Sequence, residues 1–210
     1  MSSRLIYVMD PMCSWCWGFA PVADALARQA REQGVSLHLV MGGLRSGDAV
    51  LEPGTRGYIL EHWQAVEAAT GQCFRFDGAL PDGFIYDTTP ACLAVASARH
   101  LDPDRAWELA KRIQQGFYCE GLDVTRPSVL AELAEQVGLN RADFAKAFDS
   151  AEQQAATAAD FSWAQGLGIA GFPTLLAERN GQLALLTNGY QSLDTLSPLL
   201  GRWLERAASA

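Results

Sequence analysis

Apolar and polar residues follow different periods along the chain, and each period predicts a kind of element. The apolar run RLIYVM at 4–9, bounded by Asp10-Pro11, predicts a buried strand. Apolar residues then recur every three or four positions across 19–30, which predicts a helix that ends near Gly34. The run VSLHLVMGG at 35–43 predicts a second strand. Strand, helix and strand in this order form a βαβ unit, in which the two strands are parallel.

From residue 44 to residue 168 the helical period dominates. The predicted helices cover 55–70, 88–100, 103–117, 127–137, 140–148 and 150–165. Asp102 followed by Pro103 is a strong start signal, an N-cap residue with proline at the first helical position. The length of this segment, more than half of the chain, predicts a large helical insertion.

Near the end of the chain, apolar and polar residues again follow the two-residue period of a strand. FPTLLAE at 172–178 and QLALLTN at 182–188 predict two strands of a hairpin around the turn RNG, and a last helix is expected from Ser192. The order βαβ, helices, ββα predicts an α/β fold. We expect one discontinuous domain formed by 1–43 and 169–210, and a second, all-helical insertion domain formed by 44–168.

The composition narrows the classes of partner. The chain has 210 residues, of which 24 are acidic and 16 basic, for a formal charge of −8. Only two residues are lysines and the arginines are dispersed, so the chain lacks the clustered cations that bind nucleic acid. No run approaches the ~20 apolar residues of a membrane-spanning helix, and MSSRLIYVMD lacks the apolar core of a secretory leader. We therefore predict a cytoplasmic protein with no nucleic-acid or membrane partner.

Two of the five cysteines form a C-x-x-C pair in MDPMCSWCWGFAP at 9–21. A structural zinc site usually takes four ligands, often from two such pairs. The other cysteines and the three histidines stand alone in the sequence, so no metal is predicted. An odd cysteine count in a cytoplasmic protein also disfavours a framework of disulfides. A C-x-x-C pair beside a βαβ unit is typical of redox chemistry instead.

Cys13 follows the first strand and begins the predicted helix. Unpaired N–H groups and the helix dipole stabilise an anion at that position, and the thiolate is the nucleophile in disulfide exchange. Cys16 lies one helical turn further along the same face. We expect Cys13 to be the exposed catalytic thiol that attacks, and Cys16 the shielded catalytic thiol that resolves the mixed disulfide.

Two neighbours of the pair are candidates for the same site. Trp15 lies between the cysteines, and its partly exposed ring is a candidate contact for an apolar segment of the substrate. Asp10 either accepts a proton during exchange or, together with Pro11, only shapes the turn.

The remaining cysteines have separate expectations. Cys92 fits the apolar pattern of a helix, so we expect it in the core. Cys73 and Cys119 lie near predicted helix ends, where they are either bystanders or thiols that exchange with Cys13.

The chain resembles a known family in several motifs besides the cysteine pair. These are DPMCSWCWGF (10–19), MGGLR (41–45), YDTTPAC (86–92), FYCEGLDVT (117–125) and GFPTLL (171–176). With the order of the elements, they resemble the DsbA family of thiol–disulfide oxidoreductases, and within it a cytoplasmic branch described as predicted protein-disulfide isomerases. The resemblance covers essentially the whole chain and implies a thioredoxin-like fold with a helical insertion.

The resemblance also implies roles for residues of this chain. Cys13 matches the nucleophile, Cys16 the resolving cysteine, and Pro173 a cis-proline that leaves the backbone of Phe172 free to pair with an extended substrate. Periplasmic members have Pro-His between the cysteines, where this chain has Ser14-Trp15. With no histidine beside the pair, we expect a weaker oxidant, and in a reducing cytosol we expect reduction or isomerisation rather than net oxidation.

Three functions remain open at this point. The first is a protein-disulfide oxidoreductase or isomerase with no bound cofactor, acting on protein or small-molecule thiols and disulfides, with glutathione as a candidate redox partner or co-substrate. The second is a glutathione-dependent enzyme similar to 2-hydroxychromene-2-carboxylate isomerase or the kappa-class transferases, which carry serine at the position of Cys13. The third is a binding protein or holdase without catalysis. The intact cysteine pair favours the first.

Overall fold

A four-stranded mixed sheet forms the centre of the protein in a computed structural model that describes residues 3–208. The strands are β1 (Ser3–Met9), β2 (Ser36–Met41), β3 (Thr174–Arg179) and β4 (Gln182–Asn188), in the spatial order β2-β1-β3-β4. As predicted, β1 pairs with β2 in parallel, and β3 with β4 in an antiparallel hairpin. Since β3 also pairs antiparallel with β1, the two ends of the chain build one sheet.

Two strands are shorter than predicted. The second strand ends at Met41, before Gly42 and Gly43, and the third begins at Thr174, after Phe172 and Pro173. The dipeptides Gly42-Gly43 and Phe172-Pro173 both lie at the end of the sheet where β1 leads into the cysteine pair. Proline has no N–H for a strand ladder, and Gly43 has a positive φ of 67°, so neither continues the pairing.

The central strand β1 is buried on both faces, which explains its continuous apolar run. Leu5, Tyr7 and Met9 face the main core, whereas Ile6 and Val8 face a smaller cluster on the other side of the sheet. Side chains of a strand alternate between faces, so the tyrosine at position 7 points to the same side as the helix that follows β1.

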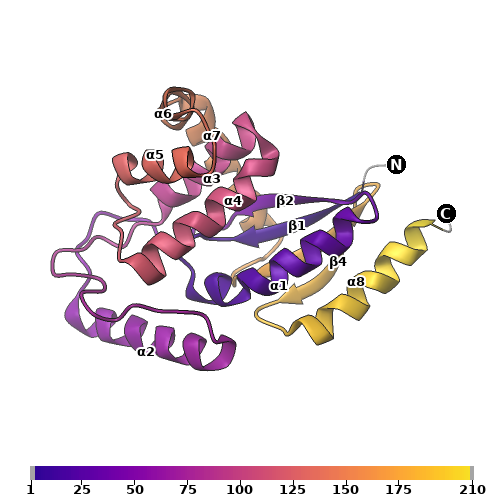
Figure 1. The fold of residues 1–210 in the computed structure, drawn as a ribbon, viewed down its shortest axis with the longest axis horizontal. Coiled ribbons are helices and arrows are strands. Elements are labelled where there is room, and N and C mark those ends of the chain that lie inside the picture. Colours follow the sequence, from indigo (N-terminus) through magenta and orange to yellow (C-terminus); the bar gives the residue numbers. More distant parts are fainter. Residues whose placement is uncertain (1–2, 209–210) are drawn as a thin grey trace.

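Helices pack around the sheet (Figure 1). They are α1 (Ser14–Arg31), α2 (Pro53–Thr70), α3 (Thr89–Leu101), α4 (Pro103–Gln115), the π-helical turn η1 (Gly116–Glu120), α5 (Pro127–Gln136), α6 (Arg141–Phe148), α7 (Ala151–Gly166) and α8 (Leu193–Ala208). The N-cap expected of Asp102 is confirmed, because its side chain accepts a hydrogen bond from a backbone N–H of the first turn. Asn140 caps α6 in the same way.

All helices between Pro53 and Gly166 come from the segment predicted as an insertion. Of these, α2 and α4 pack against α1, and α3, α4 and α7 pack against β2. Helix α8 lies beside α1 on the main-core face, as Figure 1 shows. The predicted order of elements is therefore confirmed. The division into domains at 43/44 and 168/169 stays a prediction, and its outermost residues, 1–2 and 209–210, lie outside the described residues. Between residues 3 and 208, no helix is long and apolar enough to cross a membrane.

Candidate active site

The cysteine pair lies where β1 turns into α1. Cys13 is the N-cap of α1, with an extended backbone, and its N–H donates to the Asp10 carbonyl at 3.0 Å. Cys16 follows in the first turn of the helix. The exposed fraction is 6% for Cys13 and 0% for Cys16. The expected order of exposure is right, but the expectation that Cys13 is exposed is wrong, because neighbouring segments cover most of its surface.

One of those segments is the loop before β3. The Phe172–Pro173 peptide bond is cis, as the resemblance implies. The Cys13 thiol donates a long hydrogen bond, 3.8 Å from sulfur to oxygen, to the Phe172 carbonyl. Two further bonds hold the loop: Gly189 N–H donates to the Pro173 carbonyl at 2.7 Å, and the Thr174 hydroxyl donates to the Gly171 carbonyl at 2.8 Å. The fold thus brings Cys13 and Phe172, 159 positions apart, into direct contact.

Gly42 explains how this loop fits so closely. A Cβ atom added at Gly42 would lie 2.2 Å from the ring of Phe172, far closer than a van der Waals contact. The Phe172 ring therefore rests directly on the backbone just after β2. Gly42, the first glycine of the MGGLR motif, therefore sets the position of the loop that faces Cys13.

Asp10 is fully buried behind the pair and has more partners than the turn requires. One carboxylate oxygen accepts from the Met12 N–H at 2.8 Å, which shapes the turn as expected. The other accepts from the Leu44 N–H at 2.7 Å, the Thr88 hydroxyl at 2.6 Å and the Cys92 thiol at 3.3 Å. Burial raises the pKa of Asp10, although these hydrogen bonds act in the opposite direction. The Met12 hydrogen bond supports the role of Asp10 in shaping the turn, and its role as a proton acceptor stays a prediction.

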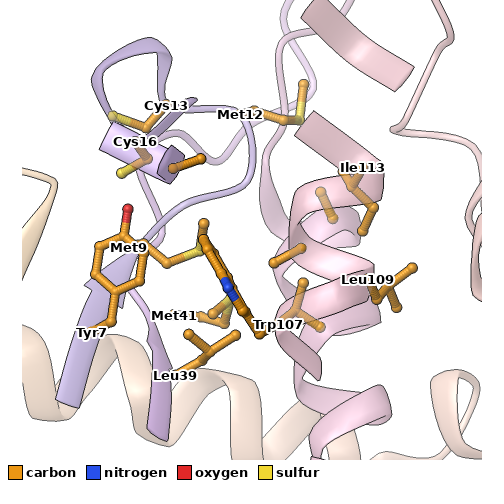
Figure 2. Close-up of a cluster of buried hydrophobic side chains, with 14 of the residues drawn as sticks. Tyr7, Met9, Met12, Cys13, Cys16, Leu39, Met41, Trp107, Leu109 and Ile113 are labelled. Atoms are coloured by element: carbon orange, nitrogen blue, oxygen red, sulfur yellow. The ribbon is translucent and has the colours of Figure 1, made fainter. Parts of the chain in front are cut away.

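Tyr7 is a site residue that the sequence pattern did not single out. Its side chain is fully buried, and its hydroxyl points toward the sulfurs of Cys16 and Cys13 (Figure 2). Burial, and then the charges of Cys16 and Cys13, raise the pKa of Tyr7 well above its ordinary value. The pKa of Cys16 is likewise raised, first by burial and then by interaction with Cys13. A tyrosine inside a buried strand needs a partner for its hydroxyl, which is the signal that points to Tyr7.

A pocket opens in front of Cys13. Its lining includes Ser14, Trp15, Leu44, Arg45, Tyr58, His62, Trp63, Tyr86 and Phe172. Trp15 is half-buried and packs on Tyr190, with ring centroids 5.7 Å apart, while Arg45 lies over the ring of Tyr86 at 5.1 Å. No histidine stands beside the pair in the sequence, and α2 brings His62 to the lining of the same pocket. The pocket therefore presents apolar rings together with two groups able to bind anions.

The comparisons with known proteins decide the family. The family described as "DSBA-like thioredoxin domain" matches residues 4–201. The chain belongs to this family. Its sheet and helices are thus those of the DsbA-like thioredoxin fold, with 53–166 supplying the helices inserted into it. A comparison with curated protein sequences found no match.

Solved structures agree with this family. A protein from Nitrosomonas europaea, provisionally described as a protein disulfide isomerase, has 38% identity and a TM-score of 0.93, covering 98% of this chain and 99% of that one. The cytosolic disulfide reductase DsbM from Pseudomonas aeruginosa has 34% identity and a TM-score of 0.80, covering 95% and 98%. A second DsbM structure, solved with GSH, has 30% identity and a TM-score of 0.77, covering 99% and 100%.

A 2-hydroxychromene-2-carboxylate isomerase shares the fold at 14% identity and a TM-score of 0.67, covering 98% of each chain. That likeness concerns the fold alone.

The other cysteines of this DsbA-like protein are distributed as follows. Cys92 is buried, as expected, and donates to Asp10 from α3. Cys73 and Cys119 lie together, with the Cys119 thiol against the Cys73 carbonyl. Across residues 3–208, no three His, Cys, Asp or Glu side chains are grouped as metal ligands would be.

Proposed function

We propose that this DsbA-like protein is a dithiol oxidoreductase that reduces or isomerises disulfides, with Cys13 as the attacking thiol and Cys16 as the resolving thiol. The observation that carries the proposal is the geometry of Cys13. Its sulfur lies at the N-terminus of α1, at the wall of a pocket, and against the Phe172 carbonyl at 3.8 Å. These are the surroundings in which a thiolate is stabilised and an extended substrate is within reach.

The first step is attack by Cys13 on a substrate disulfide. A bond forms between the Cys13 sulfur and one substrate sulfur, and the other substrate sulfur leaves as a thiolate that takes up a proton. Orientation of the substrate is assigned to Phe172, whose backbone can pair with an extended chain, and to Trp15, whose half-buried ring offers an apolar contact. Pro173 holds the turn that presents the Phe172 backbone.

The second step is attack by Cys16 on the Cys13 sulfur. Cys16 must lose its proton, the second substrate thiol leaves, and the enzyme is left with a Cys13–Cys16 disulfide. Since the pKa of Cys16 is raised by burial, a proton acceptor is needed. We assign this role to Asp10, whose pKa is raised toward that of a useful base. The Tyr7 hydroxyl is assigned to stabilising the Cys16 thiolate.

Two molecules of glutathione complete the cycle in this proposal. The first attacks the Cys13–Cys16 disulfide and forms a mixed disulfide, and the second releases glutathione disulfide and restores both thiols. The pocket supports this choice, because Arg45 and His62 line it beside Cys13 and glutathione carries two carboxylates. A DsbM structure solved with GSH, at 30% identity, is a further support.

We also propose that the protein acts in the cytoplasm, on protein or small-molecule disulfides. The acidic composition without clustered cations supports the absence of a nucleic-acid partner. The relative DsbM is described as a cytosolic disulfide reductase, which supports both the compartment and the reductive direction.

The test is turnover of insulin disulfides by the full-length protein with glutathione, glutathione reductase and NADPH. The wild type should oxidise NADPH in proportion to the insulin disulfides reduced, and Cys16→Ser should accumulate mixed disulfides at Cys13. A wild type with no redox-active dithiol by thiol titration would contradict the proposal. Full turnover by Cys16→Ser of a small electrophile with glutathione would instead establish the glutathione-dependent enzyme.

A further inference from the structure

A second pair of cysteines lies outside the active site. Cys73 follows the end of α2, and Cys119 lies in the π-helical turn η1. The Cys119 thiol donates a hydrogen bond to the backbone carbonyl of Cys73 at 3.2 Å, although the two residues are 46 positions apart. Cys73 is exposed and Cys119 is half-buried. The two thiols are therefore neighbours and reachable from solvent.

The two chain segments that carry these cysteines are already fastened together. Arg75 N–H donates to the Tyr118 carbonyl at 2.7 Å, and the Arg75 guanidinium donates to the Glu120 carbonyl at 3.1 Å. These bonds lie on both sides of Cys119 and two residues beyond Cys73. A disulfide needs closely spaced backbones and suitably directed side chains. The hydrogen bonds hold the two backbones close together here, which favours closure of a disulfide.

The Cys73 thiol also affects the Cys119 thiol. The pKa of Cys119 is raised to about 12 by burial first and then by the adjacent Cys73 thiol. At neutral pH Cys119 is therefore protonated, and the exposed Cys73 is the one placed to react first with a molecule from solvent. A reactive exposed thiol next to a protonated partner is an arrangement suited to a two-step exchange.

We propose that Cys73 and Cys119 form a second redox site, which closes an intramolecular disulfide on reaction with low-molecular-weight disulfides such as glutathione disulfide. The Cys73 thiolate attacks glutathione disulfide, forming a mixed disulfide and releasing one glutathione as thiolate, which takes up a proton. Cys119 then gives its proton to solvent and attacks the Cys73 sulfur, releasing the second glutathione. Two protein thiols are oxidised, and one glutathione disulfide is reduced to two glutathiones.

This site is connected to the catalytic helix through Trp17, which follows Cys16 directly. The Trp17 indole N–H donates to the Cys73 carbonyl at 3.0 Å, and the Gln72 side chain donates to the Trp17 carbonyl at 2.9 Å. The Trp17 ring also stacks on Tyr118, with centroids 6.2 Å apart and an interplanar angle of 8°. The disulfide would therefore form among the residues that support the first turn of α1.

Peptide mapping tests the proposal without interference from the active site. Trypsin cuts after arginine and lysine. One tryptic peptide, 5–28, contains both Cys13 and Cys16. The other cysteines fall in separate peptides, with Cys73 in 57–75, Cys92 in 76–99 and Cys119 in 113–141. Full-length protein is incubated with glutathione disulfide, its free thiols are blocked, and the digest is read by mass spectrometry without reduction. Only a Cys73–Cys119 disulfide joins 57–75 to 113–141.

We expect the joined peptides in the wild type and in the Cys13→Ser/Cys16→Ser double variant, and their loss after added dithiothreitol. We expect no joined peptides in Cys73→Ser or Cys119→Ser, with Cys119→Ser holding one glutathione on Cys73. The proposal is overturned if the wild type accumulates only the mixed disulfide of Cys73 with glutathione. It is also overturned if Cys73 and Cys119 both carry the thiol-blocking reagent, which shows that neither has reacted. Because the double variant lacks the catalytic pair, this result is independent of whether the proposed disulfide reduction takes place.

Discussion

Cys13 and Cys16 lie one helical turn apart inside a packed site, whereas Cys73 and Cys119 come from a loop and a π-helical turn at the surface. The first pair is covered by Phe172 and backed by buried side chains, so its chemistry depends on those neighbours. The second pair is held by backbone hydrogen bonds between two segments. The two pairs therefore have different neighbours, and substitutions should affect them separately.

Removing the attacking thiol has the largest expected effect. Cys13→Ser should lower the rate of insulin reduction by at least about a hundredfold, because the nucleophile is lost. Cys73→Ser is the matched control at the other pair, and its rate should stay within about twofold of the wild type. The measurement is NADPH oxidation coupled through glutathione reductase. Equal losses in both variants would show that the two pairs do not act separately.

The second-largest effect is expected from a substitution that disturbs the loop packed over Cys13. Gly42→Ala places a methyl group 2.2 Å from the Phe172 ring, so the loop must move. We expect insulin reduction to fall by about ten- to a hundredfold and the free energy of unfolding to fall by about 1–3 kcal/mol. Both are measured on the same preparation, by the coupled assay and by urea titration.

Gly57→Ala in α2 is the matched control for Gly42→Ala. A Cβ atom at Gly57 meets nothing within 4 Å, so the rate should not change and the helix should gain about 0.5–1 kcal/mol. A Gly42→Ala variant with wild-type activity would show that the position of Phe172 is not important for exchange.

Tyr7→Phe tests the buried surroundings of Cys16 and should have a smaller effect than the substitutions above. Loss of a hydroxyl that stabilises the Cys16 thiolate should lengthen the life of the mixed disulfide at Cys13 by about tenfold, the equivalent of one hydrogen bond. Quenching in acid followed by mass spectrometry measures the trapped fraction. Tyr118→Phe is the control, since Tyr118 is also fully buried but its hydroxyl interacts with Tyr86. If both variants trapped the same fraction of mixed disulfide, Tyr7 would have no specific role in the site.

The buried carboxyl group of Asp10 gives a pH-dependent effect on stability. Its folded pKa is raised above the unfolded value near 4, so the folded chain binds the proton more tightly. The wild type should therefore lose stability, relative to Asp10→Asn, as pH rises from about 4 through the folded pKa. Urea titrations of the reduced proteins across this range measure the difference. Parallel profiles would mean that Asp10 has the same pKa in both states.

Local patterns determined much of this protein from the sequence alone. The strands, the helix starts at Asp102 and Asn140, and the position of Cys13 at a strand-to-helix junction follow from periodicity and capping. Each depends on residues within one or two turns, so neighbours in sequence are enough to predict them. The family resemblance, carried by motifs spread along the whole chain, was also readable at this level and is confirmed.

Only the tertiary structure decided which distant segments meet. It brought His62 to the pocket and turned the Tyr7 hydroxyl toward Cys16, and it gave the contact between the Cys13 thiol and Phe172, a residue that the family resemblance had already assigned to the site. It also gave Asp10 partners from two other segments, and it made neighbours of Cys73 and Cys119. The physical reason is that such contacts depend on the path of the chain between the residues, which no local period or cap records.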